Sequence, residues 1–263
     1  MNIQMYYSKT DILKRLQEHN NYVSNEVNGT IIGTFLYGSQ NYYLNTPESD
    51  IDSISIYIPT QEEIYFSKDW LSKEYEMANR EHAVVKDIRI LMRDWLNGSM
   101  TNLEVLFTHF YVIKSDSMIL DIFESIKKII QAYLISNKEK MAKAIYGQVL
   151  GTAKVKYLTP KKIKNIARLY YALSIYQLAD NKSINRIFEL DIIYRKEILR
   201  VYELLFHNNV NQVTYRAIAD KYIEESEKVK NEILELSTNK DQINQLKRIL
   251  QNKVQLLINH INN

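Results

Sequence analysis

The first third of the chain contains short apolar stretches whose spacing alternates between that of a helix and that of a strand. Ser8 is a good helix cap, and the apolar residues after it recur at three- and four-residue intervals until the asparagines at positions 20 and 21. The run TIIGTFLY at 30–37 is β-branched and aromatic and is too short for a globular helix. We therefore expect an amphipathic helix that ends near residue 20, followed by a buried strand that ends at Gly38 and Ser39.

Two further stretches give the first third of the chain a mixed pattern. The run DIDSISIYI at 50–58 alternates polar and apolar residues and stops at Pro59, as a strand beside the first one would. The run EHAVVKD at 81–87 can form a third strand. Apolar residues at helical spacing follow it as far as Gly98, which predicts a helix.

Beyond about residue 116 the pattern changes to long helical periodicities. The expected helices are separated mainly by Asn, Asp, Pro and Gly, and they cover 117–134, 138–157, 161–179, 185–206, 212–235 and 240–261. The sequence thus predicts an α+β protein. A mixed sheet with flanking helices is expected in a domain at 1–115, followed by an all-α helical domain at 116–263.

Composition narrows the possible classes of protein. With 34 Lys and Arg against 31 Asp and Glu, the formal charge of +3 is too balanced for a protein whose main work is to coat nucleic acid. The lack of cysteine excludes disulfide scaffolds, cysteine-rich zinc sites and cysteine nucleophiles. The first residues lack the order of a secretion signal, and no run of about 18 apolar residues occurs. We expect a soluble, cytoplasmic protein with no membrane partner.

The stretch at 37–58 carries the candidate chemistry. Side chains two residues apart in a strand share a face, so Asp50 and Asp52 are expected to present two carboxylates together. Like charges this close repel unless a cation shares the site, and Mg²⁺ typically binds one or two carboxylates together with waters and substrate phosphates. Gly38 and Ser39 end the preceding strand, where backbone N–H groups can approach a phosphate. The combination predicts a site for a metal ion and a nucleotide.

This stretch resembles the nucleotidyltransferase superfamily typified by DNA polymerase beta, in which a G-S motif is followed by D-x-D. More narrowly, GSQNYYLNTPESDID is similar to a bacterial and phage group of predicted nucleotidyltransferases with the approximate pattern G-S-x-x-Y-G-L-x-T-x-x-S-D-x-D. The matching positions are Gly38, Ser39, Tyr42, Leu44, Thr46, Ser49, Asp50 and Asp52. Tyr43 stands where the pattern has glycine, an exchange that can alter the shape of the loop. The resemblance is specific over about 33–110 and loose in the helical half.

The resemblance implies the transfer of a nucleoside monophosphate from an NTP, with ATP the expected donor, to an acceptor hydroxyl, with release of pyrophosphate. Asp50 and Asp52 would hold Mg²⁺ or Mn²⁺ in a two-metal mechanism, and Asp87 would be a third catalytic and metal-binding carboxylate. Ser39 would contact the β- or γ-phosphate beside Gly38. The alternative for Asp87 is to cap the helix that follows it. The domain at 1–115 would be catalytic, and the helical domain would bind on the acceptor or nucleotide side. The acceptor stays open among RNA or tRNA, a protein and a small molecule.

Two other features have both a structural and a functional interpretation. The run NLEVLF at 102–107 matches the continuation of the family pattern loosely, and Glu104 in it can orient the site. We favour a helix that buries its apolar residues and leaves Glu104 exposed. Basic residues are densest at 154–168, where Lys156 and Lys162 are candidates for binding phosphate. A solvated helix face is the alternative.

Two other functions fit the same residues. The chain can be a catalytically inactive or regulatory protein that binds nucleotides. It can also be the nucleotidyltransferase partner of a toxin–antitoxin or anti-phage pair. The sequence contains no motif that distinguishes these alternatives from a nucleotidyltransferase with an independent role.

Overall fold

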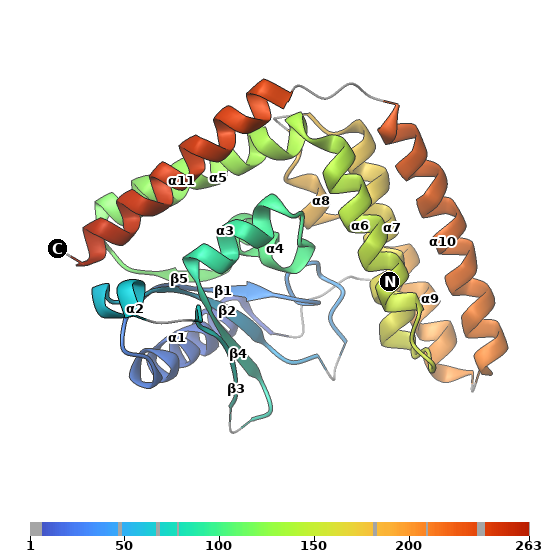
Figure 1. Ribbon diagram of the computed structural model, residues 1–263. Helices are drawn as coiled ribbons and strands as arrows, with labels where there is room; N and C mark the ends of the chain where they lie inside the picture. The colour runs from blue at the N-terminus through green and yellow to red at the C-terminus, as the bar shows by residue number, and fades with distance from the viewer. Residues whose placement is uncertain are drawn as a thin grey trace. The chain divides into compact units, whose positions relative to one another are not determined.

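The computed structural model describes residues 7–46, 49–66, 69–77, 79–180, 183–208, 210–235 and 240–262 (Figure 1). The contacts between Cα atoms divide the chain into two compact units. The sheet unit comprises Gln4–Tyr133 and Asp241–Asn263, and the helical unit comprises Leu134–Lys240. Among the described residues, no helix is both long enough and apolar enough to cross a membrane.

The sheet unit is built on five strands in the order β3-β4-β2-β1-β5. Their bounds are Thr30–Tyr37 for β1, Asp52–Ile58 for β2, Ser72–Glu76 for β3, His82–Asp87 for β4 and Tyr111–Ile113 for β5. β2 and β4 are parallel, and the other neighbouring strands are antiparallel. The three predicted strands are confirmed. β3 and β5 escaped prediction because β3 buries a single residue, Tyr75, and β5 is three residues long.

Helices cover both faces of this sheet. Their bounds are Lys9–Glu26 for α1, Gln61–Phe66 for α2, Ile88–Leu96 for α3, Met100–Phe107 for α4, Ser117–Ser136 for α5 and Lys240–Asn262 for α11. Figure 1 shows α1 on one face and α3 and α4 on the other. α1 begins at Ser8, whose hydroxyl accepts from the Asp11 N–H at 3.1 Å. The predicted end of this helix near residue 20 is wrong, because Val23 continues the buried face of α1.

Strand alternation assigns each sheet residue to one of the two faces. On the α1 face, Leu36 and Ile51 pack with Ile12 and Leu16 in one apolar cluster. A second cluster on this face joins Val23 of α1 to Tyr57, Ala83 and Val85 of the sheet. On the opposite face, Phe35 stacks on Phe123 of α5 with the ring centroids 5.2 Å apart. Candidate site residues on the strands can therefore meet only where their side chains lie on the same face.

The helical unit consists of helices in its described residues. Their bounds are Lys138–Ala153 for α6, Pro160–Leu178 for α7, Arg186–Glu189 for α8, Ile192–His207 for α9 and Gln212–Leu234 for α10. α7 packs against α6, α8, α9 and α10, and it starts with a capping Thr159 and a proline at its first position. The single helix predicted at 185–206 is divided into α8 and α9 at Leu190, where φ is 46°. The α+β class, with a mixed sheet followed by a helical region, is confirmed.

The last helix, α11, contacts other elements of the sheet unit. The Asn262 side-chain N–H donates to the carbonyl of Pro59 at 3.1 Å, just after β2. His260 Nε2 lies 3.0 Å from Asp116 Oδ2, directly before α5. The compact units therefore differ from the division at 115/116, since α11 and most of α5 group with the sheet. The functional roles assigned to the domains 1–115 and 116–263 stay predictions.

Candidate functional site

The bend after β1 lies against the first residue of β2. Gly38 has φ of 86°, a conformation that favours glycine, and Ser39 follows it. A Cβ placed on Gly38 would be 3.9 Å from Asp52 Oδ2, so the backbone of the bend and this carboxylate are in close proximity. Tyr37 and Asp52 are partners in the β1–β2 register, which places them on the same face of the sheet. The structure therefore brings together Gly38, Ser39 and Asp52.

Glu104 of α4 holds this bend in place. Glu104 Oε2 accepts from the Gly38 N–H at 2.8 Å, and Oε1 accepts from the Tyr42 hydroxyl at 2.6 Å. Glu104 is only 1% exposed, and the neighbouring Leu103 is buried as predicted. The prediction that Glu104 is exposed is wrong, because both faces of the short α4 are buried. The loose match of NLEVLF to the family pattern was the sequence signal for this role.

Tyr43, at the position where the family pattern has glycine, adopts a backbone conformation that favours glycine. Its φ is 55°, in the left-handed region that L-residues adopt at a cost of roughly 1–2 kcal/mol. The loop is closed by hydrogen bonds from the Asn41 N–H to the Gly38 carbonyl at 3.1 Å and from the Leu44 N–H to the Ser39 carbonyl at 2.9 Å. The exchange of glycine for tyrosine therefore leaves a tight turn after Gly38.

The two aspartates of the D-x-D motif have different surroundings. Asp52 is half-buried as the first residue of β2, and its Oδ1 accepts from the His82 N–H of β4 at 3.3 Å. Asp50 precedes the strand, is exposed, and forms no hydrogen bond or ion pair within the described residues. Strand alternation therefore does not fix the direction of the Asp50 side chain. The Cα atoms of two residues this close in the chain are at most about 7 Å apart.

Asp87 lies at the far end of the sheet from Asp52. In the parallel β2–β4 pair, Asp87 is the partner of Tyr57, five residues beyond Asp52, which is about 16 Å along the strands. Because five is an odd number, the two aspartates also lie on opposite faces of the sheet. Asp87 is 1% exposed, caps α3 through the Arg89 N–H at 2.8 Å, and pairs with the Arg89 guanidinium at 2.6 Å. The structure does not bring Asp87 together with Asp50 and Asp52, and the helix-capping alternative describes its contacts.

A second carboxylate at the Asp52 end of the sheet comes from Glu81, which sequence reasoning missed. Its Oε2 accepts from Arg15 Nη2 at 2.8 Å and lies 3.0 Å from His19 Nε2, both on α1. Burial by itself would raise the pKa of Glu81, but the His19 hydrogen bond and the Arg15 charge outweigh it and lower the pKa. Glu81 and Asp50 line the same cavity of about 410 Å³ beside α1. The signal available in the sequence was an acidic residue at the start of the predicted strand at 81–87.

The side chains around the bend produce a negative field. Burial raises the pKa of Tyr37, and the nearby charges of Asp52, Glu74 and Glu104 raise it further. Three carboxylates thus act on the hydroxyl of one half-buried tyrosine at the end of β1. This end of the sheet therefore favours a cation over an additional anion.

The residues present can supply part of a site for Mg²⁺ or Mn²⁺. In the described part of the chain, no three Asp, Glu, His or Cys side chains are grouped as metal ligands. Asp52 beside the Gly38 bend and Asp50, which has no partner in the described part of the chain, offer carboxylate oxygens, the ligand type that Mg²⁺ uses together with waters and substrate phosphates. The donor set therefore fits an ion that arrives with a nucleotide, and not an ion that the protein alone encloses.

Lys156 and Lys162 belong to the helical unit, near the start of α7. Lys156 is exposed, with its Nζ 5.2 Å from the centroid of the Tyr157 ring. Lys162 Nζ donates to the Tyr157 carbonyl at 3.1 Å. Within the same basic stretch Lys164 is buried, and its Nζ lies 4.9 Å from the centroid of the Tyr202 ring. The binding of phosphate by Lys156 and Lys162 stays a prediction.

Comparison with known proteins adds distant structural likeness. No protein-family model matches the chain, and no curated protein matches it. A solved nucleotidyltransferase-like protein from Exiguobacterium sibiricum 255-15 is similar over 93% of this chain and 91% of that chain, with 11% sequence identity and a TM-score of 0.29. A likeness at this level does not establish the activity of this chain, which has to be inferred from its own residues.

Proposed function

We propose that this chain is a metal-dependent nucleotidyltransferase that transfers a nucleoside monophosphate from an NTP, most favourably ATP, to an acceptor hydroxyl and releases pyrophosphate. The observation that carries the proposal is the proximity of the Gly38 bend to Asp52, whose Oδ2 lies 3.9 Å from the position that a Cβ on Gly38 would occupy. It combines a backbone that a phosphate can approach with a carboxylate that a divalent ion can use. The G-S and D-x-D motifs of the family pattern occupy these same positions.

Each residue of the bend has a distinct part in this proposal. The Gly38 N–H already donates a hydrogen bond to Glu104, so it fixes the turn and does not bind the phosphate. The Ser39 N–H forms no hydrogen bond within the described residues, and its hydroxyl lies 3.3 Å from the Ser49 hydroxyl. The Ser39 amide is therefore the donor offered to the β- or γ-phosphate, and the Ser39 hydroxyl, which donates to Ser49, would have to exchange that partner to bind there.

The acidic residues account for the metal dependence. Asp52 and Asp50 would hold Mg²⁺ or Mn²⁺, which would neutralise the triphosphate and lower the pKa of the acceptor hydroxyl. Glu81, which directly precedes β4 at the Asp52 end, lines the cavity with Asp50 but faces α1, on the side of the sheet opposite Asp52. In our proposal Glu81 therefore replaces Asp87 as a carboxylate beside Asp50, and not as a ligand shared with Asp52. Arg15 and His19 fix Glu81 in its ionised form, which is the form that accepts a proton or contacts a cation.

The test is a transfer assay with the full chain. Each of the four NTPs, labelled on the α-phosphate, is incubated with tRNA, total protein or a small-molecule extract in the presence of Mg²⁺ or Mn²⁺, and label transfer and pyrophosphate are measured. We expect Asp52→Asn to reduce transfer by at least about 100-fold and Asp50→Asn to reduce it strongly. The matched control is Asp121→Asn, which changes an exposed carboxylate on α5. Absence of transfer with every NTP and metal, or full transfer by Asp52→Asn, would refute the proposal.

A binding role without catalysis is distinguished by calorimetry on the same samples. An inactive or regulatory protein would bind an NTP with the metal and release no pyrophosphate. Association with a toxin–antitoxin or anti-phage partner would instead appear as label transferred to that partner protein.

A further inference from the structure

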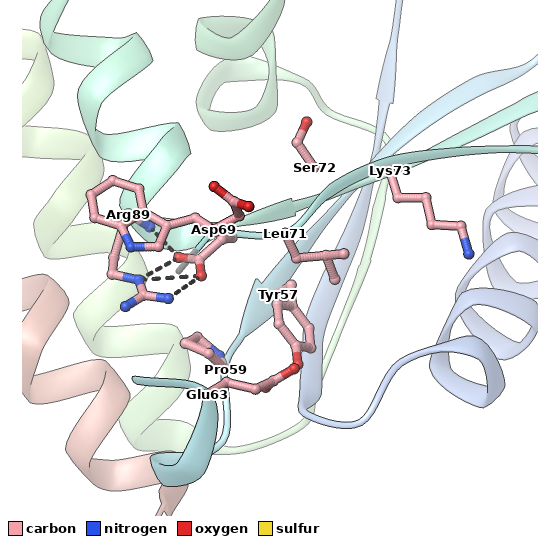
Figure 2. A pocket seen from close by; sticks show the side chains of 10 residues that line it. Tyr57, Pro59, Glu63, Asp69, Leu71, Ser72, Lys73 and Arg89 are labelled. Carbon is pink, nitrogen blue, oxygen red and sulfur yellow. Dashed lines mark hydrogen bonds and ion pairs between the residues drawn. The ribbon is translucent and has the colours of Figure 1, made fainter. Parts of the chain in front are cut away.

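A second cavity lies at the opposite end of the sheet, where the parallel strands β2 and β4 end. Its volume is about 340 Å³, within the range of small-molecule sites. The lining comes from residues 57–63, 69–73 and 87–89, and Figure 2 shows these side chains around the opening. The carboxyl ends of parallel strands are a frequent location of ligand sites in sheets with helices on both faces. Asp87, about 16 Å along the strands from Asp52, belongs to this cavity.

A buried ion pair in this cavity supports an aromatic ring. Asp87 is 1% exposed, and its Oδ2 accepts from Arg89 Nη2 at 2.6 Å. The Arg89 guanidinium lies 4.9 Å from the centroid of the Trp70 ring, while Trp70 stays 44% exposed. Because a buried carboxylate is costly unless it is paired, Asp87 fixes the position of Arg89. The arginine in turn fixes the indole ring, which leaves an oriented aromatic surface open to solvent.

Polar groups beside the ring are open to a ligand. Asp69 and Ser72 are exposed, and their side chains form no hydrogen bond within the described residues. The Trp70 indole N–H also has no partner among the described residues. The lining therefore offers a carboxylate acceptor, a hydroxyl that can accept or donate, and the N–H donors of Arg89 and Trp70.

We propose that this cavity binds a nucleobase, with the base stacked on Trp70 and its edge paired with Asp69 and Ser72. Nucleobase edges carry donors and acceptors together, and they stack on aromatic rings and on guanidinium planes. An alkylammonium ligand has donors only and would leave the N–H donors of Arg89 and Trp70 without an acceptor. The base is one with an exocyclic amino group, because Asp69 accepts hydrogen bonds and cannot donate them when ionised.

The charges of the lining favour the uncharged nucleoside part of a ligand over phosphate groups. The lining has three carboxylates, those of Glu63, Asp69 and Asp87, against the two positive charges of Arg89 and Lys73. In Figure 2 the Lys73 side chain extends away from Arg89, and its Nζ lies 4.4 Å from the centroid of the Tyr75 ring outside the cavity lining. A triphosphate within this lining would be repelled. The cavity is therefore separate from the proposed NTP site and does not depend on it.

The test is the binding of adenosine, guanosine, cytidine and uridine to the full chain by calorimetry and tryptophan fluorescence. Nucleosides lack phosphates, so the proposed metal site contributes little to their binding. The chain has two tryptophans, and Trp95 is fully buried, so a change in emission on binding reports on Trp70. We expect saturable binding of the three amino-bearing nucleosides, with uridine the weakest.

Variants separate this site from the proposed catalytic site. Trp70→Ala is expected to weaken nucleoside binding by about 5- to 150-fold, the range for the loss of one stacked base, while Trp70→Phe keeps most of it. Asp69→Asn is expected to reduce the preference over uridine. Asp52→Asn and Tyr65→Ala, which changes a 77% exposed ring on α2, are expected to leave binding unchanged. The proposal is overturned if no nucleoside binds, if Trp70→Ala binds as well as the unchanged chain, or if putrescine binds more tightly than the nucleosides.

Discussion

The contact of Glu104 with the Gly38 bend allows a quantitative prediction. Glu104→Ala removes the acceptor of two donors, the Gly38 N–H and the fully buried Tyr42 hydroxyl. Leaving a buried donor unpaired costs about 1–3 kcal/mol, so the two together predict a loss of about 2–6 kcal/mol in the free energy of unfolding. Glu104→Gln keeps an acceptor for Gly38 and can donate to the Tyr42 oxygen. It exchanges charge-assisted hydrogen bonds for neutral ones, which predicts a smaller loss of about 1–2 kcal/mol.

Urea unfolding followed by tryptophan fluorescence measures this loss in the relevant part of the chain. Both tryptophans, Trp70 and Trp95, belong to the sheet unit, and the indole N–H of Trp95 donates to the Asn102 carbonyl within α4 at 2.8 Å. The signal therefore follows the unfolding of the unit that contains Glu104. The matched control is Glu62→Ala, an exposed carboxylate on α2, which is expected to change the free energy by less than about 0.5 kcal/mol.

Two outcomes of the unfolding measurements would contradict this reasoning. If Glu104→Ala costs no more than Glu62→Ala, the two hydrogen bonds do not hold the bend. If Glu104→Gln costs as much as Glu104→Ala, the lost interaction is the charge and not the pair of hydrogen bonds. A fall in nucleotide transfer of Glu104→Gln with little loss of stability would show that the bend has to be positioned as well as folded.

Three further predictions follow from the same contacts. Asp87→Ala removes the α3 cap and leaves the Arg89 guanidinium without its buried partner. The free energy of unfolding of the sheet unit, measured with urea, should therefore fall by about 3 kcal/mol. Nucleotide transfer by the folded variant should stay within a fewfold of that of the unchanged chain. The pKa of Glu81 is lowered below its ordinary 4.5, so the stability of the chain relative to Glu81→Gln should be fully present above pH 4.5 and decline as the pH falls below it. Gly29→Ala would place a Cβ 2.3 Å from the Ile58 carbonyl oxygen and should lower the melting temperature by several degrees, whereas Gly147→Ala, on α6 with nothing within 4 Å, should raise it slightly.

Opposite outcomes would be equally informative. Loss of transfer in folded Asp87→Ala equal to that in Asp52→Asn would restore Asp87 to the catalytic site. An advantage over Glu81→Gln that grows as the pH falls would mean that Glu81 is protonated in the folded chain. A Gly29→Ala variant as stable as the unchanged chain would mean that the β1 start can move away from Ile58.

Local pattern in the sequence was enough to determine the elements with strong periodicity. The β-branched run at 30–37 and the alternating run at 50–58 form β1 and β2, and the long helical periodicities beyond residue 116 form helices. These segments are buried along a continuous face, and that burial is what the spacing of apolar residues records. The predicted helix ends were less accurate, since Val23 extends α1 and Leu190 divides a predicted helix in two.

The proximity of the G-S bend to Asp52 could be expected from the sequence, because consecutive antiparallel strands place the end of one beside the start of the next. The long-range contacts of Glu104 and Glu81, and the distance of Asp87 from Asp52, could not. Glu104 reaches Gly38 across 66 residues of chain, and its burial depends on the helices and strands around α4. No local pattern records a contact at that separation.

For Asp87 the decision lay in strand direction. The alternating pattern specifies only that Asp87 ends a strand and that Ala83 and Val85 share its face. Only the pairing of β4 parallel to β2 puts Asp87 at the opposite end of the sheet from Asp52 and puts Glu81 at the same end. The sequence by itself thus determined the strongly periodic elements and the G-S and D-x-D motifs, but not β3 and β5. The tertiary structure decided which charges meet, because strand order and direction depend on contacts between residues far apart in the chain.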